Sequence, residues 1–142
     1  MQAVNFEERL EQMTRSDPRF SRNAYLFIRE ALDYTQKMVE KKSKDEMRHV
    51  TGQELLVGIR KYALEQFGPM AQMVFNEWGI QSCEDFGELV FNMVESNLLA
   101  KTAQDTREDF KNGYDFFEVF RRPFLPGKET PAPEREPKST QV

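Results

Sequence analysis

Helix start and stop signals constrain the centre of this chain more than any other feature of the sequence. Thr51 and Glu54 have the spacing of a capping box, in which a hydroxyl and a carboxylate satisfy the first backbone N–H groups of a helix. Gly68-Pro69 ends that helix and begins the next, because glycine tolerates a left-handed helix end and proline suits a first helical turn. Gly79 then predicts a left-handed end to the second helix. Two successive helices are therefore expected between residues 51 and 79.

A third helix is predicted from residue 82 to residue 96. Ser82 and Asp85 repeat the capping-box spacing, and apolar residues follow at helical intervals. Gly58 and Gly87 lie inside predicted helices, where each glycine costs about 1 kcal/mol relative to alanine. Close approach of a neighbouring helix is the simplest compensation, so we expect both glycines to lie at helix contacts.

The N-terminal part of the chain also has the periodicity of helices. A first helix is expected over residues 5–14, and a longer one begins at Ser21 with an apolar stripe broad enough for a central helix. Residues 40–46 are charged and predict a solvated connection. The expected fold class is therefore mainly α, a compact bundle of five or six helices. The helices on either side of Gly79 are expected to form a pair like a helix-turn-helix.

Residues 98–116 lack this periodicity and are consistent with a small β-hairpin, or wing. Residues 98–102 resemble a short strand, residues 110–116 fit a strand that returns antiparallel to it, and Asn112-Gly113 is a tight-turn signal. A helix, a turn, a helix and a hairpin is the order of a winged helix-turn-helix, whose second helix enters the major groove of DNA.

Length and proline content set the expected limits of the domain. The 142 residues fit one domain, which we expect to span residues 1–124. Residues 121–142 hold five of the seven prolines, and no large apolar residue follows Leu125. Such a segment does not bury enough surface to offset the entropy of ordering, so residues 125–142 are predicted to be a disordered tail.

Apolar runs and cysteine content bear on location. No run approaches the roughly 18 apolar residues of a membrane span, and the N-terminus is charged from Glu7 onward. We therefore expect neither membrane insertion nor a secretory signal. The single cysteine, Cys83, excludes an internal disulfide, and a reducing cytoplasm is the expected location.

The motifs of catalysis and metal binding are incomplete in this sequence. Four carboxylates crowd residues 105–115, but a calcium loop aligned on Gly113 leaves apolar side chains at two ligand positions. A solvated acidic turn is therefore favoured over a metal site, and no cofactor is expected. His49 and Cys83 lack partners at zinc-ligand spacing, and the sequence has no glycine-rich phosphate loop. An enzyme is not favoured, and no catalytic residue is assigned.

The charge of the chain is concentrated in its centre. The net charge is −4, but residues 51–120 alone carry twelve acidic and five basic side chains. This surplus predicts a non-catalytic protein–protein interaction module that docks a partner with a basic surface. Phe75 and Phe91 are expected to build the core with the other aromatic residues, but they fall off the cleanest apolar faces and would be partner anchors if exposed. The expected acidic docking face consists of Glu84, Glu88, Glu95, Asp105, Glu108, Asp109 and Asp115.

Two other functions stay open. A nucleic-acid- or ribosome-associated regulatory protein would use the winged-helix order and a basic patch. The helix predicted over residues 82–96, which would enter the groove, however holds four acidic residues and neither lysine nor arginine, so phosphate groups would repel it. An enzyme would need a concave site in which His49 meets carboxylates from other helices. The basic patch of the first alternative consists of Lys37, Lys41, Lys42, Lys44 and Arg48.

Several segments of the chain carry a family resemblance. They are RHVTGQELLVGIRKYALEQFGPMA, VFNEWGI, EDFGELVFNMVE, LLAKT and DTREDFKNGYDF, with AYLFIREALDYTQK as an N-terminal helix. Through these segments, residues 17–122 resemble the Minf_1886-type conserved hypothetical proteins, a small bacterial family known mainly from planctomycetes and verrucomicrobia. The resemblance implies a bacterial cytoplasmic protein and assigns no activity, substrate or site.

Overall fold

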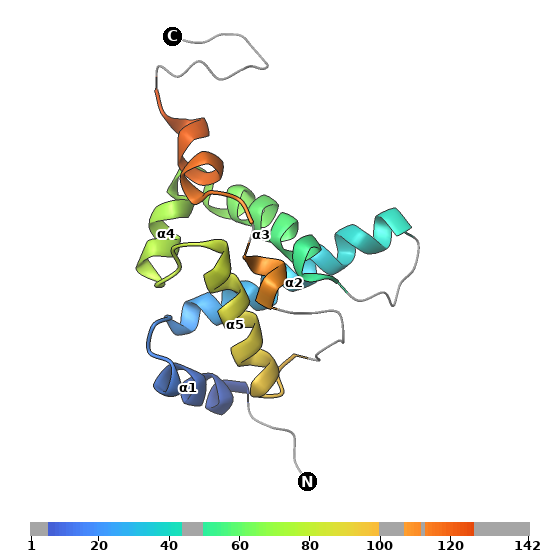
Figure 1. Cartoon of the computed structure of the whole chain (residues 1–142), viewed down its shortest axis with the longest axis vertical. Coiled ribbons are helices and arrows are strands. Elements are labelled where there is room, and N and C mark those ends of the chain that lie inside the picture. The colour runs from blue at the N-terminus through green and yellow to red at the C-terminus, as the bar shows by residue number, and fades with distance from the viewer. Residues whose placement is uncertain (1–5, 44–49, 100–106, 112, 127–142) are drawn as a thin grey trace.

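The protein is built from helices, which Figure 1 shows in a computed structural model of the chain. The structure describes residues 6–43, 50–99, 107–111 and 113–126. Within these ranges there is no strand, and no helix is long and apolar enough to cross a lipid bilayer. The expected mainly α class is confirmed. The α-helices are α1 (Phe6–Ser16), α2 (Arg22–Ser43), α3 (Gly52–Phe67), α4 (Ala71–Glu77) and α5 (Cys83–Glu95), and the shorter helical turns are η1 (Gly68–Met70), η2 (Arg107–Phe110), η3 (Phe117–Arg121) and η4 (Arg122–Phe124).

The longest helix, α2, packs most extensively against α3 and also contacts α1 and α5. At the centre of the α2–α3 contact, Thr35 faces Gly58 so closely that a β-carbon on Gly58 would lie 1.7 Å from the Thr35 hydroxyl oxygen. Thr35 is fully buried, and its hydroxyl donates to the Ala31 carbonyl at 2.7 Å. The buried hydroxyl therefore has a hydrogen-bond partner. Gly58 therefore lies at a close helix contact, as its position in the sequence predicts.

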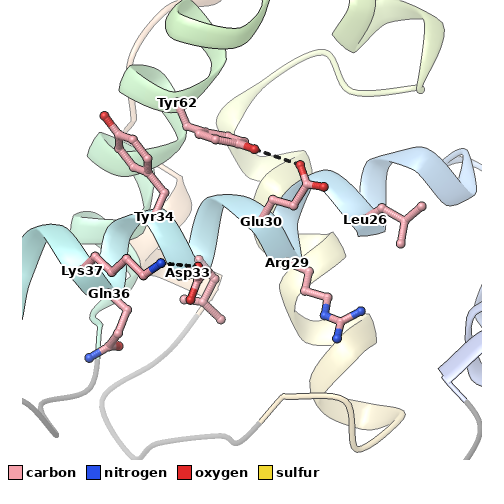
Figure 2. A pocket seen from close by; sticks show the side chains of 9 residues that line it. Leu26, Arg29, Glu30, Asp33, Tyr34, Gln36, Lys37 and Tyr62 are labelled. Atoms are coloured by element: carbon pink, nitrogen blue, oxygen red, sulfur yellow. Dashed lines mark hydrogen bonds and ion pairs between the residues drawn. The ribbon is translucent and has the colours of Figure 1, made fainter.

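Two tyrosines lie where this contact meets solvent. The rings of Tyr34 and Tyr62 are 5.2 Å apart between their centroids, one from each helix (Figure 2). The Tyr62 hydroxyl donates to Glu30 at 2.9 Å, and the Tyr34 hydroxyl donates to Glu65 at 2.8 Å. Tyr62 thus packs its ring against the core, Tyr34 lies against Tyr62, and both place their polar ends at the surface.

The predicted helix ends are confirmed at three of four positions. The Thr51 hydroxyl accepts from the Glu54 N–H at 3.1 Å, and the Glu54 carboxylate accepts from the Thr51 N–H at 3.0 Å, which completes the capping box. Gly68 and Gly79 have φ values of 52° and 88°, the left-handed region that glycine adopts without strain.

The capping box predicted at Ser82 and Asp85 does not form, so this prediction is wrong. The Asp85 N–H donates to the Ser82 backbone carbonyl at 3.0 Å, so this N–H needs no bond from the Ser82 hydroxyl. The Asp85 carboxylate instead accepts from the N–H of Gln81, at 2.8 Å. The start of α5 is therefore fixed by a carboxylate that reaches one residue further back than the capping-box pattern predicts.

The α2 helix is also longer than expected. It continues to Ser43, into the segment from residue 40 that the sequence predicts as a connection. Glutamate and lysine are favourable helix formers, so charge alone does not end a helix. The rest of that connection, and the predicted tail beyond residue 126, lie outside the described residues.

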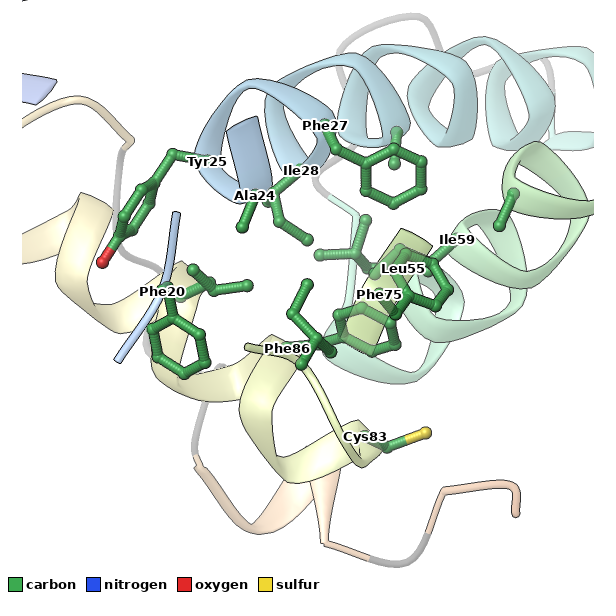
Figure 3. Close-up of a cluster of buried hydrophobic side chains, with 14 of the residues drawn as sticks. Phe20, Ala24, Tyr25, Phe27, Ile28, Leu55, Ile59, Phe75, Cys83 and Phe86 are labelled. Atoms are coloured by element: carbon green, nitrogen blue, oxygen red, sulfur yellow. The ribbon is translucent and has the colours of Figure 1, made fainter. Parts of the chain in front are cut away.

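An aromatic core occupies the space between the helices, as Figure 3 shows in part. Phe75 is fully buried, and its ring lies 5.4 Å from Phe27, 5.4 Å from Phe86 and 5.3 Å from Phe120 between centroids. Phe75 is therefore a core residue, as expected of the aromatic side chains, and is not an exposed partner anchor. Phe91 is half-buried and packs against the core.

The wing expected near residues 98–116 is not confirmed. Residues 107–110 form a 3₁₀ turn, and the described neighbours at 98–99 and 113–116 are not in a strand. The physical reason is the burial of Phe110, whose ring fills the space beside two glycines. A β-carbon would lie 2.9 Å from this ring on Gly87 and 3.2 Å from it on Gly52. Residues 100–106 and Asn112 lie outside the described residues.

The α2–α3 contact predicts that Gly58→Ala destabilises the protein. Helix propensity alone would stabilise the variant by about 1 kcal/mol. The clash with Thr35 outweighs this gain, and we expect a net loss of about 1–3 kcal/mol in the free energy of unfolding, measured by urea titration. Adding Thr35→Ala should recover part of the loss. An unchanged or raised stability of Gly58→Ala would contradict the close contact.

Candidate functional site

Three of the seven residues of the predicted acidic face share one side of α5. Glu84, Glu88 and Glu95 are spaced by four and seven residues, which places them in one row along the helix. Glu84 and Glu95 are exposed, and Glu88 is half-buried. The helix contains neither lysine nor arginine, so this row has no counter-charge on its own element.

The connection between α1 and α2 is held by backbone contacts against the residues that join α4 to α5. The Ser21 N–H donates to the Trp78 carbonyl at 3.1 Å. Gly79 passes so close to this connection that a β-carbon on it would lie 2.0 Å from the Arg19 carbonyl oxygen. Glycine is therefore required at Gly79 by contact as well as by its φ angle. The result is that Asp17, at the end of α1, lies beside α5.

Asp17 is the centre of a hydrogen-bonded network. Arg19 donates to both of its carboxylate oxygens, from Nε at 2.8 Å and from Nη2 at 2.6 Å, and also lies 3.5 Å from Glu88. The side-chain amide of Asn92 donates to Asp17 and to the Tyr25 hydroxyl, each at 3.0 Å. The hydrogen bond from Arg19, assisted by that from Asn92, holds the pKa of Asp17 well below its usual range. Asp17 therefore keeps its negative charge at neutral pH.

A pocket of about 270 Å³ opens between the end of α1 and the end of α5. Its lining is polar, apart from Met13, and no lysine or arginine is among the described residues that line it. Arg9 lies nearby and donates to the Ser96 backbone carbonyl. The lining residues are Gln12, Met13, Ser16, Asp17, Asn92, Glu95 and Ser96. We call this hollow the α1–α5 pocket.

The structure does not gather all seven predicted acidic residues at this pocket. Glu95 lines it, and Glu88 joins its network through Arg19. Asp109 is half-buried on η2, close to Gly52, and Asp115 is exposed and accepts from the Glu118 N–H at 3.0 Å. The side chains of Asp105 and Glu108 lie outside the described part of the chain.

Asp17 and Asn92 are the site residues that sequence reasoning missed. Asp17 precedes a proline, a pattern that predicts a helix cap or a turn and nothing more. Asn92 lies four residues after Glu88 and so borders the acidic row, which is the one signal that could have selected it. The contact that joins Asp17 to Asn92 spans 75 residues of sequence, beyond the reach of any local pattern.

A second hollow of about 860 Å³ follows the outer side of α2, shown in Figure 2. Its charges are of both signs and are engaged within the protein. Lys37 pairs with Asp33 at 3.3 Å, Glu30 accepts from Tyr62, and the Arg29 guanidinium lies 4.4 Å from the centroid of the Phe6 ring. This hollow therefore favours neither a cationic nor an anionic ligand.

The predicted basic patch is described only in part. Lys37 is exposed and forms the surface pair with Asp33, an interaction that contributes little in water. Lys41 and Lys42 belong to the last turn of α2, but their side chains lie outside the described part of the chain, as do Lys44 and Arg48.

Cys83 is a buried free cysteine. Its thiol donates to the Tyr114 carbonyl at 3.5 Å, and burial raises the pKa of the thiol to about 11. The thiol is therefore protonated and unreactive at neutral pH. No group of three or more potential ligands of a metal ion occurs among the residues that the structure describes, and His49 lies outside them.

Comparison with known proteins adds no relative to this picture. No protein-family model, curated protein or solved structure matches the chain. The family resemblance of residues 17–122 stays a prediction, and the site rests on its own geometry.

The Asp17 network predicts a pH-dependent contribution to stability. Because the pKa of Asp17 is lower in the folded protein than its value of 3.8 without partners, the contribution is present above pH 3.8 and is lost as the pH falls below it. We expect Asp17→Asn to lower the free energy of unfolding by about 1.5–3 kcal/mol at pH 7. The difference from the parent protein should be smaller at pH 2.5.

The matched control for this experiment is Asp33→Asn. Asp33 also pairs with a basic side chain, but both members are exposed, at 69% and 75% of their side-chain surfaces. We expect its effect to stay within about 0.5 kcal/mol at either pH, measured by urea titration. An equal effect of the two substitutions, or an Asp17→Asn difference that does not change with pH, would show that the network is not coupled to folding.

Proposed function

We propose that this protein is a non-catalytic interaction module that binds a partner protein with a basic surface through the acidic side of α5. The observation that carries the proposal is the row of Glu84, Glu88 and Glu95 on a helix that has no basic residue, beside a pocket to which Asp17 adds a further carboxylate. A surface with one sign of charge steers a partner of opposite sign and selects against partners of like sign.

The rigidity of this surface supports docking. The α5 helix is anchored by side chains that are fully buried, among them Phe86 and Leu89. The turn that supplies Asp17 is tied to α5 through Arg19 and Asn92. A partner would meet the carboxylates of Asp17 and Glu88 already held in place by Arg19, so less entropy is lost on ordering these two groups.

The remaining residues of the predicted face extend this proposal. Asp109 lies on η2, which packs against α5, and the segment also carries Asp105, Glu108 and Asp115. These residues would add long-range attraction rather than direct anchoring, since charges at the rim of an interface act mainly on the association rate. The proposed docking face is therefore centred on α5.

Charge-neutralising substitutions test this proposal. Glu84→Gln with Glu95→Gln removes two exposed charges from the face, and Asp33→Asn with Glu77→Gln removes two exposed charges from elsewhere. Each double variant is used as bait, and the captured proteins are cross-linked and quantified. We expect the first variant to lose about tenfold in partner recovery, equivalent to about 1.4 kcal/mol, while the control stays at the parental level.

Two results would contradict the proposal. One is equal recovery of partners by both double variants. The other is capture that nuclease treatment abolishes and that depends on Lys37, which would favour the nucleic-acid-associated alternative. Electrophoretic shift titrations at 50 and 200 mM salt distinguish that case, because phosphate contacts weaken by orders of magnitude over such a range.

A further inference from the structure

We propose that the α1–α5 pocket is an anchor site for a single arginine side chain of the partner. The inference rests on the proposed function, since it names the group by which a basic partner is held. The observation behind it is a set of hydrogen-bond acceptors, contributed by both helices, that converge on one small hollow.

The Asn92 amide supplies the first acceptor. Its two N–H hydrogens are donated to Asp17 and to the Tyr25 hydroxyl, at 3.0 Å each. These two bonds fix the orientation of the side chain and leave its carbonyl oxygen as the group available to a ligand. Tyr25 is fully buried, so this orientation is set from inside the core.

Glu95 supplies the charge. It is exposed at the edge of the pocket, and no residue in the described part of the chain forms a hydrogen bond or an ion pair with it. Asp17 adds a second carboxylate to the lining, but Arg19 largely offsets its charge. Of the two carboxylates in the lining, Glu95 is therefore the one that no ion pair offsets, and its charge is complementary to a cation.

The remaining lining residues suit the chemistry of an arginine side chain. Gln12 and Ser16 bring further polar groups from α1, and Met13 offers an apolar surface for an aliphatic stem. A guanidinium has five donors in a fixed plane and no acceptor, which suits a site whose acceptors come from several directions. The Ser96 carbonyl is already used by Arg9, so it is not one of the available acceptors.

A titration followed by nuclear magnetic resonance tests the inference without the partner. The probe is N-acetyl-arginine amide, added to the full ¹⁵N-labelled chain, and its control is the citrulline analogue, which has nearly the same shape and no charge. We expect saturable shifts of backbone amides around residues 12–17 and 92–96, with a millimolar dissociation constant, and at least fivefold weaker binding of the citrulline analogue.

Substitutions test whether the arginine probe binds at the α1–α5 pocket. Glu95→Gln should weaken the binding of the arginine probe at least fivefold, whereas Asp33→Asn, on the outer side of α2, should leave it unchanged. The inference is overturned if the probe gives no saturable shift, if the citrulline analogue binds equally well, or if the shifts lie along α2 instead.

The two proposals fail in different ways. If partner recovery depends on Glu84 and Glu95 but the arginine probe does not bind, the docking face stands and the pocket inference is wrong. If the probe binds at the pocket but partner recovery is the same for both double variants, the pocket binds a guanidinium and the proposed docking function is wrong.

Discussion

The close contact of α2 with α3 at Thr35 and Gly58 is the constraint on which the rest of the structure depends. It lets the fully buried Thr35 of α2 lie directly against the backbone of α3. The same device recurs at the start of α3 and within α5, where Gly52 and Gly87 leave room for the ring of Phe110. Glycines inside helices, which weaken those helices locally, are thus the points at which neighbouring elements come closest.

Most of the helical structure could be predicted from the sequence because its signals are local. The capping box of Thr51 and Glu54 and the left-handed ends at Gly68 and Gly79 involve residues within a few positions of one another. Phe75 shows the limit of prediction from local signals. Its position off the apolar face of α4 left its burial undecided by the local pattern, and rings from α2, α5 and η3 surround it. A local sequence pattern does not reveal that a residue is buried by elements distant in the sequence.

Part of the candidate site could also be predicted from local signals, and part of it could not. Helical periodicity alone predicts that Glu84, Glu88 and Glu95 share one side of α5, and the structure places them so. Asp17 could not be predicted, because its place beside Asn92 depends on the contact of the α1–α2 connection with Trp78 and Gly79. That contact places Asp17 beside Asn92, so that both line the α1–α5 pocket together with Glu95, the last residue of the row.

The central claim is that a basic partner is attracted to the acidic side of α5. The most direct measurement is the association rate of the partner with the protein at 50 and 300 mM salt, with the dissociation rate recorded in the same experiment. Electrostatic steering predicts that the association rate falls about tenfold at the higher salt concentration, while the dissociation rate changes little. An association rate that does not depend on salt would contradict the account.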